Sequence, residues 1–348
     1  MTEISIAEQA KRDVLKASKP LVWEKIQEYP QKVMRGESIA IIQYQHSYVC
    51  NMACRHCCIT PLRRPSSTRH FEISDTKELA RQADAMGLAH WVITGGEPLM
   101  FKDFDQIVEA IDPSKFYITS DTNGLLLDSA KAKHLKEIGV DKIQLSLDSL
   151  SASEHDAFRR HTGSWAAAVR AIDACKEAGL NLILSTVVTK NRIRSFEFTE
   201  FLGWAGEIEV PVFVTYAKPV GAWRGRADLM IDKSDMEFMG QLEKQFNVFT
   251  HLTPSYGMDI GCIAVKRMIS VTAYGDVMPC PYMHVSLGNV FKEPLKDIVD
   301  RTLGTTCFGR RIDTCLVAED VDFVESLDIA TLNRPLPIPY KEMFGEQA

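Results

Sequence analysis

The segment SYVCNMACRHCCITP, residues 47–61, gathers four of the chain's nine cysteines within nine positions. Cys50, Cys54 and Cys57 follow the spacing C-x3-C-x2-C. Three thiolates this close together repel one another unless a cation holds them. Iron–sulfur clusters are bound by cysteine thiolates at such short spacings. Zinc sites usually combine paired C-x2-C elements with a second pair or with distant histidines.

Three thiolates on a cluster of four irons leave one iron open, which parallels the free coordination position of a catalytic metal site. Cys58 is an alternative fourth ligand. Adjacent thiolates rarely reach two corners of one cube without strain, so we interpret Cys58 as a neighbour. A stripe of buried cysteines is another alternative, because spacings of 4 and 3 match a helix face. Its flanking residues are too polar for a core: His46, Asn51, Arg55 and His56.

A second set of four cysteines lies in the last third of the chain: Cys262, Cys280, Cys307 and Cys315. Four is the number of thiolates that a closed 4Fe–4S cluster needs. Zinc bound by the same thiolates is the chemical alternative, and scattered buried thiols are another. Cys175, inside AIDACKEAGL, is interpreted as a small core residue on a helix.

The composition restricts the function classes. The chain has 348 residues and a net charge of −6, which gives no basic surface for nucleic acid. No apolar run approaches the roughly 20 residues of a membrane span. The N-terminus lacks the apolar core of a signal peptide, so we expect a cytoplasmic protein with reduced thiols. Compartment, size and the odd cysteine count all disfavour a disulfide framework.

From about residue 38 the chain alternates short β-like runs with amphipathic helical stretches. Ser74 and Ser164 are predicted helix caps, and Gly139 and Gly179 predicted helix ends. The predicted helices span 74–87, 103–111, 128–139, 164–179 and 195–206. The predicted strands span 38–45, 90–96, 115–124, 141–148, 181–189 and 209–217. This alternation predicts parallel βαβ units, either as a partial barrel or as an open doubly wound sheet.

In either architecture the functional residues are expected at the carboxyl ends of the strands, where the motifs lie. Beyond about residue 230 we predict a helix at 234–246 and a hairpin at 268–280. The predicted organisation is an N-terminal helical extension (1–37), a core (38–230), an auxiliary domain (231–320) and an extended, proline-rich tail (321–348).

Two motifs together resemble the radical S-adenosylmethionine (SAM) superfamily. They are C-x3-C-x2-C after the first strand and GGEP, Gly95 to Pro98, after the second. The resemblance covers residues 38–220. It implies an α/β fold with a partial, TIM-like (βα)6 barrel. It also implies reductive cleavage of SAM at the open iron of the first cluster, giving a 5′-deoxyadenosyl radical.

The resemblance assigns SAM binding to residues at the strand ends: Gly95, Gly96, Glu97, Pro98, Asn123, Ser146 and Arg159. The glycines would let the backbone approach a ligand closely. Glu97 would accept the methionyl amine, and Arg159 would clamp the carboxylate, with Arg160 as the alternative. Asn123 would lie near the ribose, although TNG is equally an ordinary turn. Cys58 stands where the family commonly has an aromatic residue.

The second cysteine set resembles the auxiliary-cluster extension of the SPASM/Twitch subgroup, on the G-x4-C element that ends at Cys280. The full SPASM pattern needs about seven cysteines for its two extra clusters, and this chain has four beyond the barrel, so a one-cluster, Twitch-like domain is expected. By this resemblance Cys262, Cys280, Cys307 and Cys315 bind an auxiliary 4Fe–4S cluster that accepts an electron from a substrate radical. If Cys307 or Cys315 is not a ligand, an open iron would be available for substrate.

The predicted function is therefore a radical SAM oxidoreductase that abstracts hydrogen from an unactivated carbon of a small metabolite. A small molecule is expected because about 37 residues precede the first strand, too few for a peptide-recognition domain. Maturation of a ribosomally made peptide is the alternative, and a noncatalytic iron–sulfur or zinc protein is the rival from another class. Flavodoxin or ferredoxin is the expected external electron donor.

Two groups of arginines are predicted to face the cavity and suit an anionic or flat substrate, with solvated loop arginines as the alternative. These are Arg63, Arg64, Arg69, Arg224 and Arg226.

Overall fold

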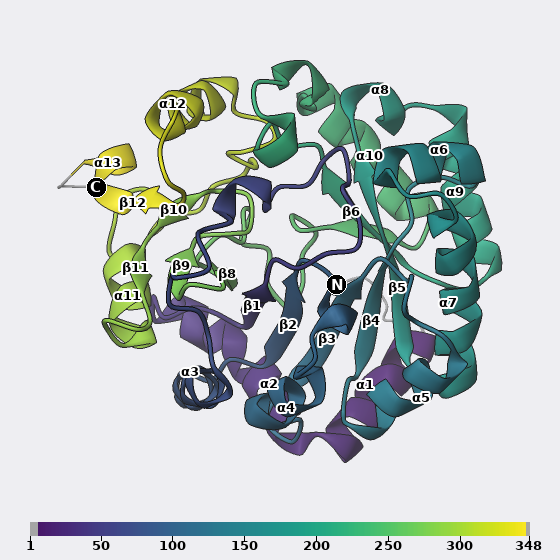
Figure 1. Cartoon of the computed structure of the whole chain (residues 1–348), viewed down its shortest axis with the longest axis horizontal. Helices are drawn as coiled ribbons and strands as arrows, with labels where there is room; N and C mark the ends of the chain where they lie inside the picture. Colours follow the sequence, from purple (N-terminus) through teal and green to yellow (C-terminus); the bar gives the residue numbers. More distant parts are fainter. Residues whose placement is uncertain (1–5, 346–348) are drawn as a thin grey trace.

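Six parallel strands form the centre of a ten-stranded sheet in the computed structural model, which describes residues 6–345 (Figure 1). Each strand pairs with the next one along the chain. A doubly wound sheet would reverse its strand order, and this order does not reverse, so the partial barrel is confirmed. The strands are β1 (Ile41–Ser47), β2 (His90–Gly95), β3 (Tyr117–Thr122), β4 (Lys142–Ser146), β5 (Asn181–Val188) and β6 (Val212–Tyr216).

Helices connect the successive strands and bury one apolar face each. In α4, Phe104, Ile107, Val108 and Ile111 recur at the spacing of one helix face and are all buried. The connecting helices are α3 (Ile73–Ala85), α4 (Phe104–Ile111), α5 (Ser129–Glu137), α7 (Ser164–Ala178) and α9 (Phe196–Glu207). Two shorter helices, α6 (Ala152–Arg159) and α8 (Lys190–Ile193), were not predicted.

The predicted serine caps are wrong at both helices. Helix α3 begins at Ile73, and the carboxylate of Asp75 accepts the Glu72 N–H at 3.1 Å. Ser164 is already the first residue of α7. There the carboxylate of Asp156, from the preceding helix, accepts three donors, including the N–H of Trp165 at 2.8 Å. Acidic side chains satisfy the free N–H groups of these helix ends instead.

The N-terminal segment forms two helices, α1 (Ile6–Ser18) and α2 (Pro20–Met34), against the amino ends of the strands. Between them, Lys19 donates to the carbonyl of Phe116 at 3.0 Å and pairs with Asp141. Phe116 and Asp141 precede β3 and β4 directly. These helices therefore cover the end of the barrel opposite the motifs. No helix within residues 6–345 is long and apolar enough to cross a membrane.

The second cysteine set lies on a continuation of the same sheet. Strand β8 (Met268–Val271) pairs in parallel with β1 and, as predicted, forms a hairpin with β9 (Asp276–Met278). The edge strand β11 (Gly288–Asn289) pairs with β9. At the other edge, α10 (Lys233–Gln245) leads into β7 (Val248–Thr250), which pairs with β6. The helix α11 (Leu295–Leu303) packs on the hairpin side, next to α3.

The predicted extended tail is wrong over much of its length. It contains α12 (Val321–Thr331), whose first turn is capped by Asp320, and α13 (Tyr340–Phe344). Between them the short strand β12 (Ile338–Pro339) pairs with β10 (Val285–Ser286). The prolines occupy only residues 335–339, so they do not interrupt the helix before them. Residues 1–5 and 346–348 of the predicted extension and tail lie outside the described residues.

Candidate active site

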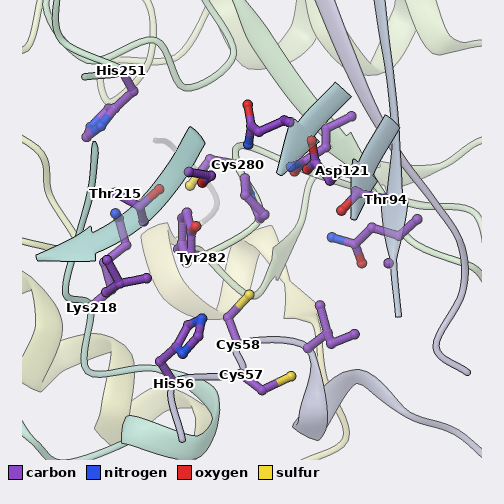
Figure 2. A pocket seen from close by; sticks show the side chains of 18 of the residues that line it. His56, Cys57, Cys58, Thr94, Asp121, Thr215, Lys218, His251, Cys280 and Tyr282 are labelled. Carbon is purple, nitrogen blue, oxygen red and sulfur yellow. The ribbon is translucent and has the colours of Figure 1, made fainter. Parts of the chain in front are cut away.

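A cavity of about 280 Å³ lies at the carboxyl ends of the parallel strands, and both cysteine sets line it. The first set contributes Cys50, Cys54 and Cys57, and the second contributes Cys262, Cys280 and Cys315. Figure 2 shows part of this wall, with Cys57 and Cys58 below Cys280 and Tyr282. Two groups of thiols that are far apart in the sequence therefore face one space.

The loop that carries the first set is clamped by main-chain hydrogen bonds. The N–H of Gly96 donates to the Ser47 carbonyl, and the N–H of Glu97 to the Val49 carbonyl, both at 2.8 Å. A Cβ on Gly96 would lie 1.9 Å from the Val49 oxygen. We had expected a ligand to approach these glycines. In the structure, the backbone just before Cys50 lies against Gly96.

A third glycine, which the motif reasoning missed, packs on the other end of this loop. Gly221 has φ +63°, and a Cβ there would lie 2.4 Å from the Cys57 carbonyl oxygen. The N–H of Ala222 donates to the same oxygen at 2.9 Å. On a third side, the N–H of Arg55 donates to the Phe158 carbonyl at 3.0 Å. The loop is therefore fixed by the segments that follow β2 and β6 and by α6 at once.

The chemistry of the cysteines fits a cluster bound by three thiolates. All three thiols are free, and burial raises the pKa of Cys50 and of Cys54. A buried thiol stays neutral unless a cation draws off its proton, as iron does on coordination. In Figure 2 the sulfur of the adjacent Cys58 lies nearer Tyr282 and Cys280 than the sulfur of Cys57 does. This arrangement agrees with Cys58 as a neighbour of the site.

Glu97 is a buried carboxylate, 1% exposed, at the cavity wall. Its Oε1 accepts the Thr122 hydroxyl at 2.7 Å, and its Oε2 accepts the N–H of Asn123 at 2.8 Å. Burial raises its pKa to about 6 although these donors oppose the shift. Pro98 is buried and does not line the cavity; it begins the short 3-10 helix Pro98–Met100. Pro98 shapes the turn beside Glu97, and its assignment to SAM binding stays a prediction.

Arg159 faces the cavity, whereas Arg160 is exposed and does not line it. The Arg159 Nε donates to Asp148 Oδ2 at 2.6 Å, and its Nη1 lies 4.0 Å from the Cys54 sulfur. Burial alone would raise the pKa of Asp148, but the adjacent Arg159 holds it at about 2. Asp148, which we had not singled out, therefore fixes the guanidinium beside the first set.

Asn123 and Ser146 also line the cavity, as expected for SAM-binding residues. The side-chain amide of Asn123 forms two hydrogen bonds, one through its nitrogen and one through its oxygen. It donates to Asn51 Oδ1 at 2.7 Å and accepts the N–H of Leu125 at 3.0 Å. It therefore belongs both to a turn and to the cluster loop. His56 stacks on Phe158 at 4.6 Å between ring centroids, which places its flat ring beside the cysteines.

The second set is brought together by a contact between distant segments. The N–H of Cys262 donates to the Ile312 carbonyl at 2.7 Å, three residues before Cys315. Burial raises the pKa of Cys280 to about 11 and that of Cys315 to about 12. Cys307 is half-buried and does not line the cavity. Three of the four predicted ligands thus face the space that the first set faces.

The barrel interior supplies polar residues that sequence reasoning missed. They stand at alternate positions of the strands and so share the inner face. Burial raises the pKa of Asp121 to about 7, and its Oδ1 has no hydrogen-bond partner within residues 6–345. Alternating polar residues in otherwise apolar strands were the available signal. These lining residues are Gln43, Gln45, Thr94, Asp121, Gln144, Ser185 and Thr215.

The predicted arginine groups do not line the cavity. Arg64 pairs with Asp276 at 2.7 Å, Arg69 with Asp75 at 2.8 Å, and Arg226 with Asp228 at 2.7 Å. The basic residues that do line it, besides Arg159, are His56, Lys218 and His251.

Comparison with protein families places two domains on this chain. Residues 44–199 match the radical SAM superfamily, and residues 262–315 match the SPASM iron–sulfur cluster-binding domain. Together the domains imply a SAM-binding 4Fe–4S cluster, an auxiliary cluster and SAM.

Curated relatives are similar over most of the chain. The AdoMet-dependent heme synthase of Nitratidesulfovibrio vulgaris is 25% identical over 290 residues, covering 74% of this chain and 78% of that protein. The mycofactocin maturase MftC of Mycobacterium tuberculosis is 26% identical over 270 residues, covering 72% and 68%.

Solved structures share the fold. Streptococcus suis SuiB bound to precursor peptide SuiA has a TM-score of 0.61 and 18% identity, covering 81% of this chain and 69% of that chain. Native anSMEcpe with bound AdoMet has a TM-score of 0.58 and 18% identity, covering 80% and 83%.

Proposed function

Because the chain belongs to the radical SAM superfamily and carries a SPASM domain, we propose that it is a tailoring oxidoreductase that attacks an unactivated carbon of a peptide. The observation that carries the proposal is that two cysteine sets and a polar barrel interior line one cavity. When bound, the first cluster and SAM supply a 5′-deoxyadenosyl radical. The residues of this chain bind, orient and enclose the reactants.

In this proposal Cys50, Cys54 and Cys57 hold the first cluster. Glu97 accepts the SAM ammonium with the lone pair that Thr122, Asn123 and Leu99 leave free. Arg159 uses its Nε for Asp148 and keeps its other N–H groups for the SAM carboxylate. Asn123 and Ser146 complete the wall on the side of β3 and β4. A flavodoxin or ferredoxin is the proposed electron donor.

The second cysteine set would hold a closed auxiliary cluster, whose chemistry is one-electron transfer. Its ligands would be Cys262, Cys280, Cys307 and Cys315. With such an acceptor on the same cavity, loss of a hydrogen atom followed by loss of one electron and one proton makes the reaction a net two-electron oxidation. Asp121, with its unpartnered Oδ1, is suited to receive that proton.

Two substrate classes are supported to different degrees. A peptide is favoured because one relative is a maturase by name, mycofactocin maturase, and a structural neighbour was solved with a precursor peptide. A small metabolite, our expectation from the sequence, is the second candidate and is supported by the similarity to heme synthase. In both cases the substrate would reach the donors and acceptors of Gln43, Asp121 and Gln144.

The class of chemistry is tested by anaerobic reconstitution, reduction with dithionite and addition of SAM. We expect 5′-deoxyadenosine from the wild-type protein and none from Cys54→Ala. A noncatalytic iron–sulfur or zinc protein would yield none from either. Iron and sulfide near eight per chain would support two cubes, whereas a content near four would remove the second.

The substrate class is tested separately. Short peptides encoded beside the gene are synthesised and incubated with the reduced protein and SAM, and their masses are compared before and after reaction. A peptide that loses two hydrogens in step with 5′-deoxyadenosine formation supports maturation. If peptides remain unchanged while a cell metabolite extract raises 5′-deoxyadenosine formation, the small-molecule reading replaces it.

A further inference from the structure

A buried lysine that has no carboxylate partner among residues 6–345 lines the cavity together with the second cysteine set. Lys218 follows β6, is 6% exposed and lines the cavity. Its ammonium donates to the Tyr216 carbonyl at 3.0 Å and stands 4.1 Å from the centroid of the Tyr282 ring. Both contacts are to uncharged groups. Figure 2 shows Lys218 beside Tyr282, on the side of the cavity away from Asp121 and Thr94.

No carboxylate in the described chain forms an ion pair with this ammonium. The charge of Lys218 acts to lower the pKa of Glu319, but Glu319 forms no ion pair with it. The Glu319 Oε2 accepts the N–H of Cys315 at 2.6 Å. Burying an unpaired cation is costly, so buried charges in proteins are normally paired or lie against a metal group. The position of Lys218 therefore calls for an anionic group in the cavity.

Lys218 lines the same cavity as three members of the second cysteine set, Cys262, Cys280 and Cys315. The ring beneath its ammonium belongs to Tyr282, two residues after Cys280. A 4Fe–4S cluster bound by thiolates is negatively charged and becomes more negative on reduction. Its potential depends on the net charge around it. A fixed cation on this side of the cavity therefore favours the reduced state.

We propose that Lys218 is a positioning residue that compensates the charge of the auxiliary cluster and raises its reduction potential. It does so without touching the substrate. The inference rests on the proposed electron-accepting role of the second cysteine set. It adds the reason why that set, and not the first, would receive the electron.

The test measures the auxiliary cluster alone. The first cluster is removed with Cys50→Ala, Cys54→Ala and Cys57→Ala in the full chain, and the remaining cluster is titrated by EPR against solution potential. We expect Lys218→Met to bind the electron about tenfold more weakly, a fall of about 59 mV. Lys218→Arg keeps the charge and should keep the potential. An unchanged potential in Lys218→Met overturns the proposal.

Lys142→Met is the matched control, because Lys142 is a half-buried lysine of β4 that does not line the cavity and acts electrostatically on Asp121 and Asp141. It should leave the potential of the auxiliary cluster unaltered; a fall equal to that of Lys218→Met would overturn the proposal. Iron content and the EPR spectrum report whether each variant retains its cluster. Loss of the cluster in Lys218→Met and Lys218→Gln, with retention in Lys218→Arg, supports charge compensation. Loss in all three overturns it.

These measurements use neither SAM nor a substrate. A lowered potential in a protein that oxidises no peptide would support the role of Lys218 and reject the proposed function. An unchanged potential in a protein that does oxidise a peptide would do the reverse.

Discussion

The two cysteine sets each have a buried cation nearby, but the two cations are compensated differently. Arg159, beside Cys54, is tied to the Asp148 carboxylate at 2.6 Å. Within the described residues, Lys218 donates to a main-chain carbonyl and lies over an aromatic ring, with no carboxylate in an ion pair. An arginine–carboxylate pair adds little net charge, whereas a lone lysine adds a full one. The comparison teaches that two prospective cluster sites on one cavity can differ in their electrostatic surroundings, the first close to neutral and the second positive.

The largest expected effect separates the two sets by function. Cys54→Ala should abolish 5′-deoxyadenosine formation, because it removes a proposed ligand of the cluster that would bind SAM. Cys280→Ala should keep substrate-independent cleavage of SAM and lose oxidation of the substrate. Both are measured by chromatography of the products. Equal loss of SAM cleavage in the two variants would contradict this division of roles.

Asp148→Asn makes the first site resemble the second by leaving its cation unpaired. Removing one partner of a buried pair costs about 3–5 kcal/mol, so we expect a large fall in the free energy of unfolding. Denaturant titration measures it. Asp228→Asn breaks the fully exposed pair with Arg226 and should change little, because solvent screens that pair. Similar losses in the two variants would show that burial of the Arg159 pair is not the cause.

Asp121 lies on the opposite side of the cavity from Lys218 and has a raised pKa of about 7 (Figure 2). Burial favours its neutral form, so its contribution to stability is present at low pH and is lost between about pH 4 and pH 7. Between pH 5 and pH 8 the wild-type protein should lose about 3 kcal/mol relative to Asp121→Asn. Chemical unfolding at the two pH values measures this difference. Parallel pH profiles would reject it.

Gly96→Ala tests whether the loop of the first set is held by its close backbone contact. The added Cβ would overlap the Val49 oxygen, so we expect a loss of about 2 kcal/mol or more in stability and a lower iron content. Gly203→Ala is the control, since nothing lies within 4 Å of a Cβ there. Within α9 it should stabilise by about 0.5–1 kcal/mol. Retention of full iron content in Gly96→Ala would contradict the clamp.

The fold could be predicted from the sequence because it depends on local periodicity. Strands and helices of the barrel alternate in regular pattern, and the boundaries of β5 and α7 were predicted within one residue at each end. The predicted cap of α7 was wrong because Asp156, which caps this helix, reaches it from the preceding helix. The prediction of an extended tail was wrong because it rested on the prolines. The segment before them, VDFVESLDIAT, forms α12.

The site was predictable where its chemistry is local and was missed where it is not. Cys50, Cys54 and Cys57 lie within eight positions, and their spacing alone predicts a cluster site. The sequence does not indicate that Lys218 and Asp121 line the cavity, because the fold determines which face of the barrel each side chain occupies. The five arginines were misplaced because at least Arg64, Arg69 and Arg226 have carboxylate partners outside the cavity, and spacing does not reveal these.

The parallel pairing of β1 with β8 has a mechanical consequence. The loop of the first set leaves the end of β1, and the hairpin that leads to Cys280 begins with β8. A ladder of main-chain bonds therefore joins the supports of both prospective redox centres, leaving no hinge between these two strands to vary their spacing. Electron tunnelling across that gap would proceed at a nearly constant length, so its speed would be governed by driving force.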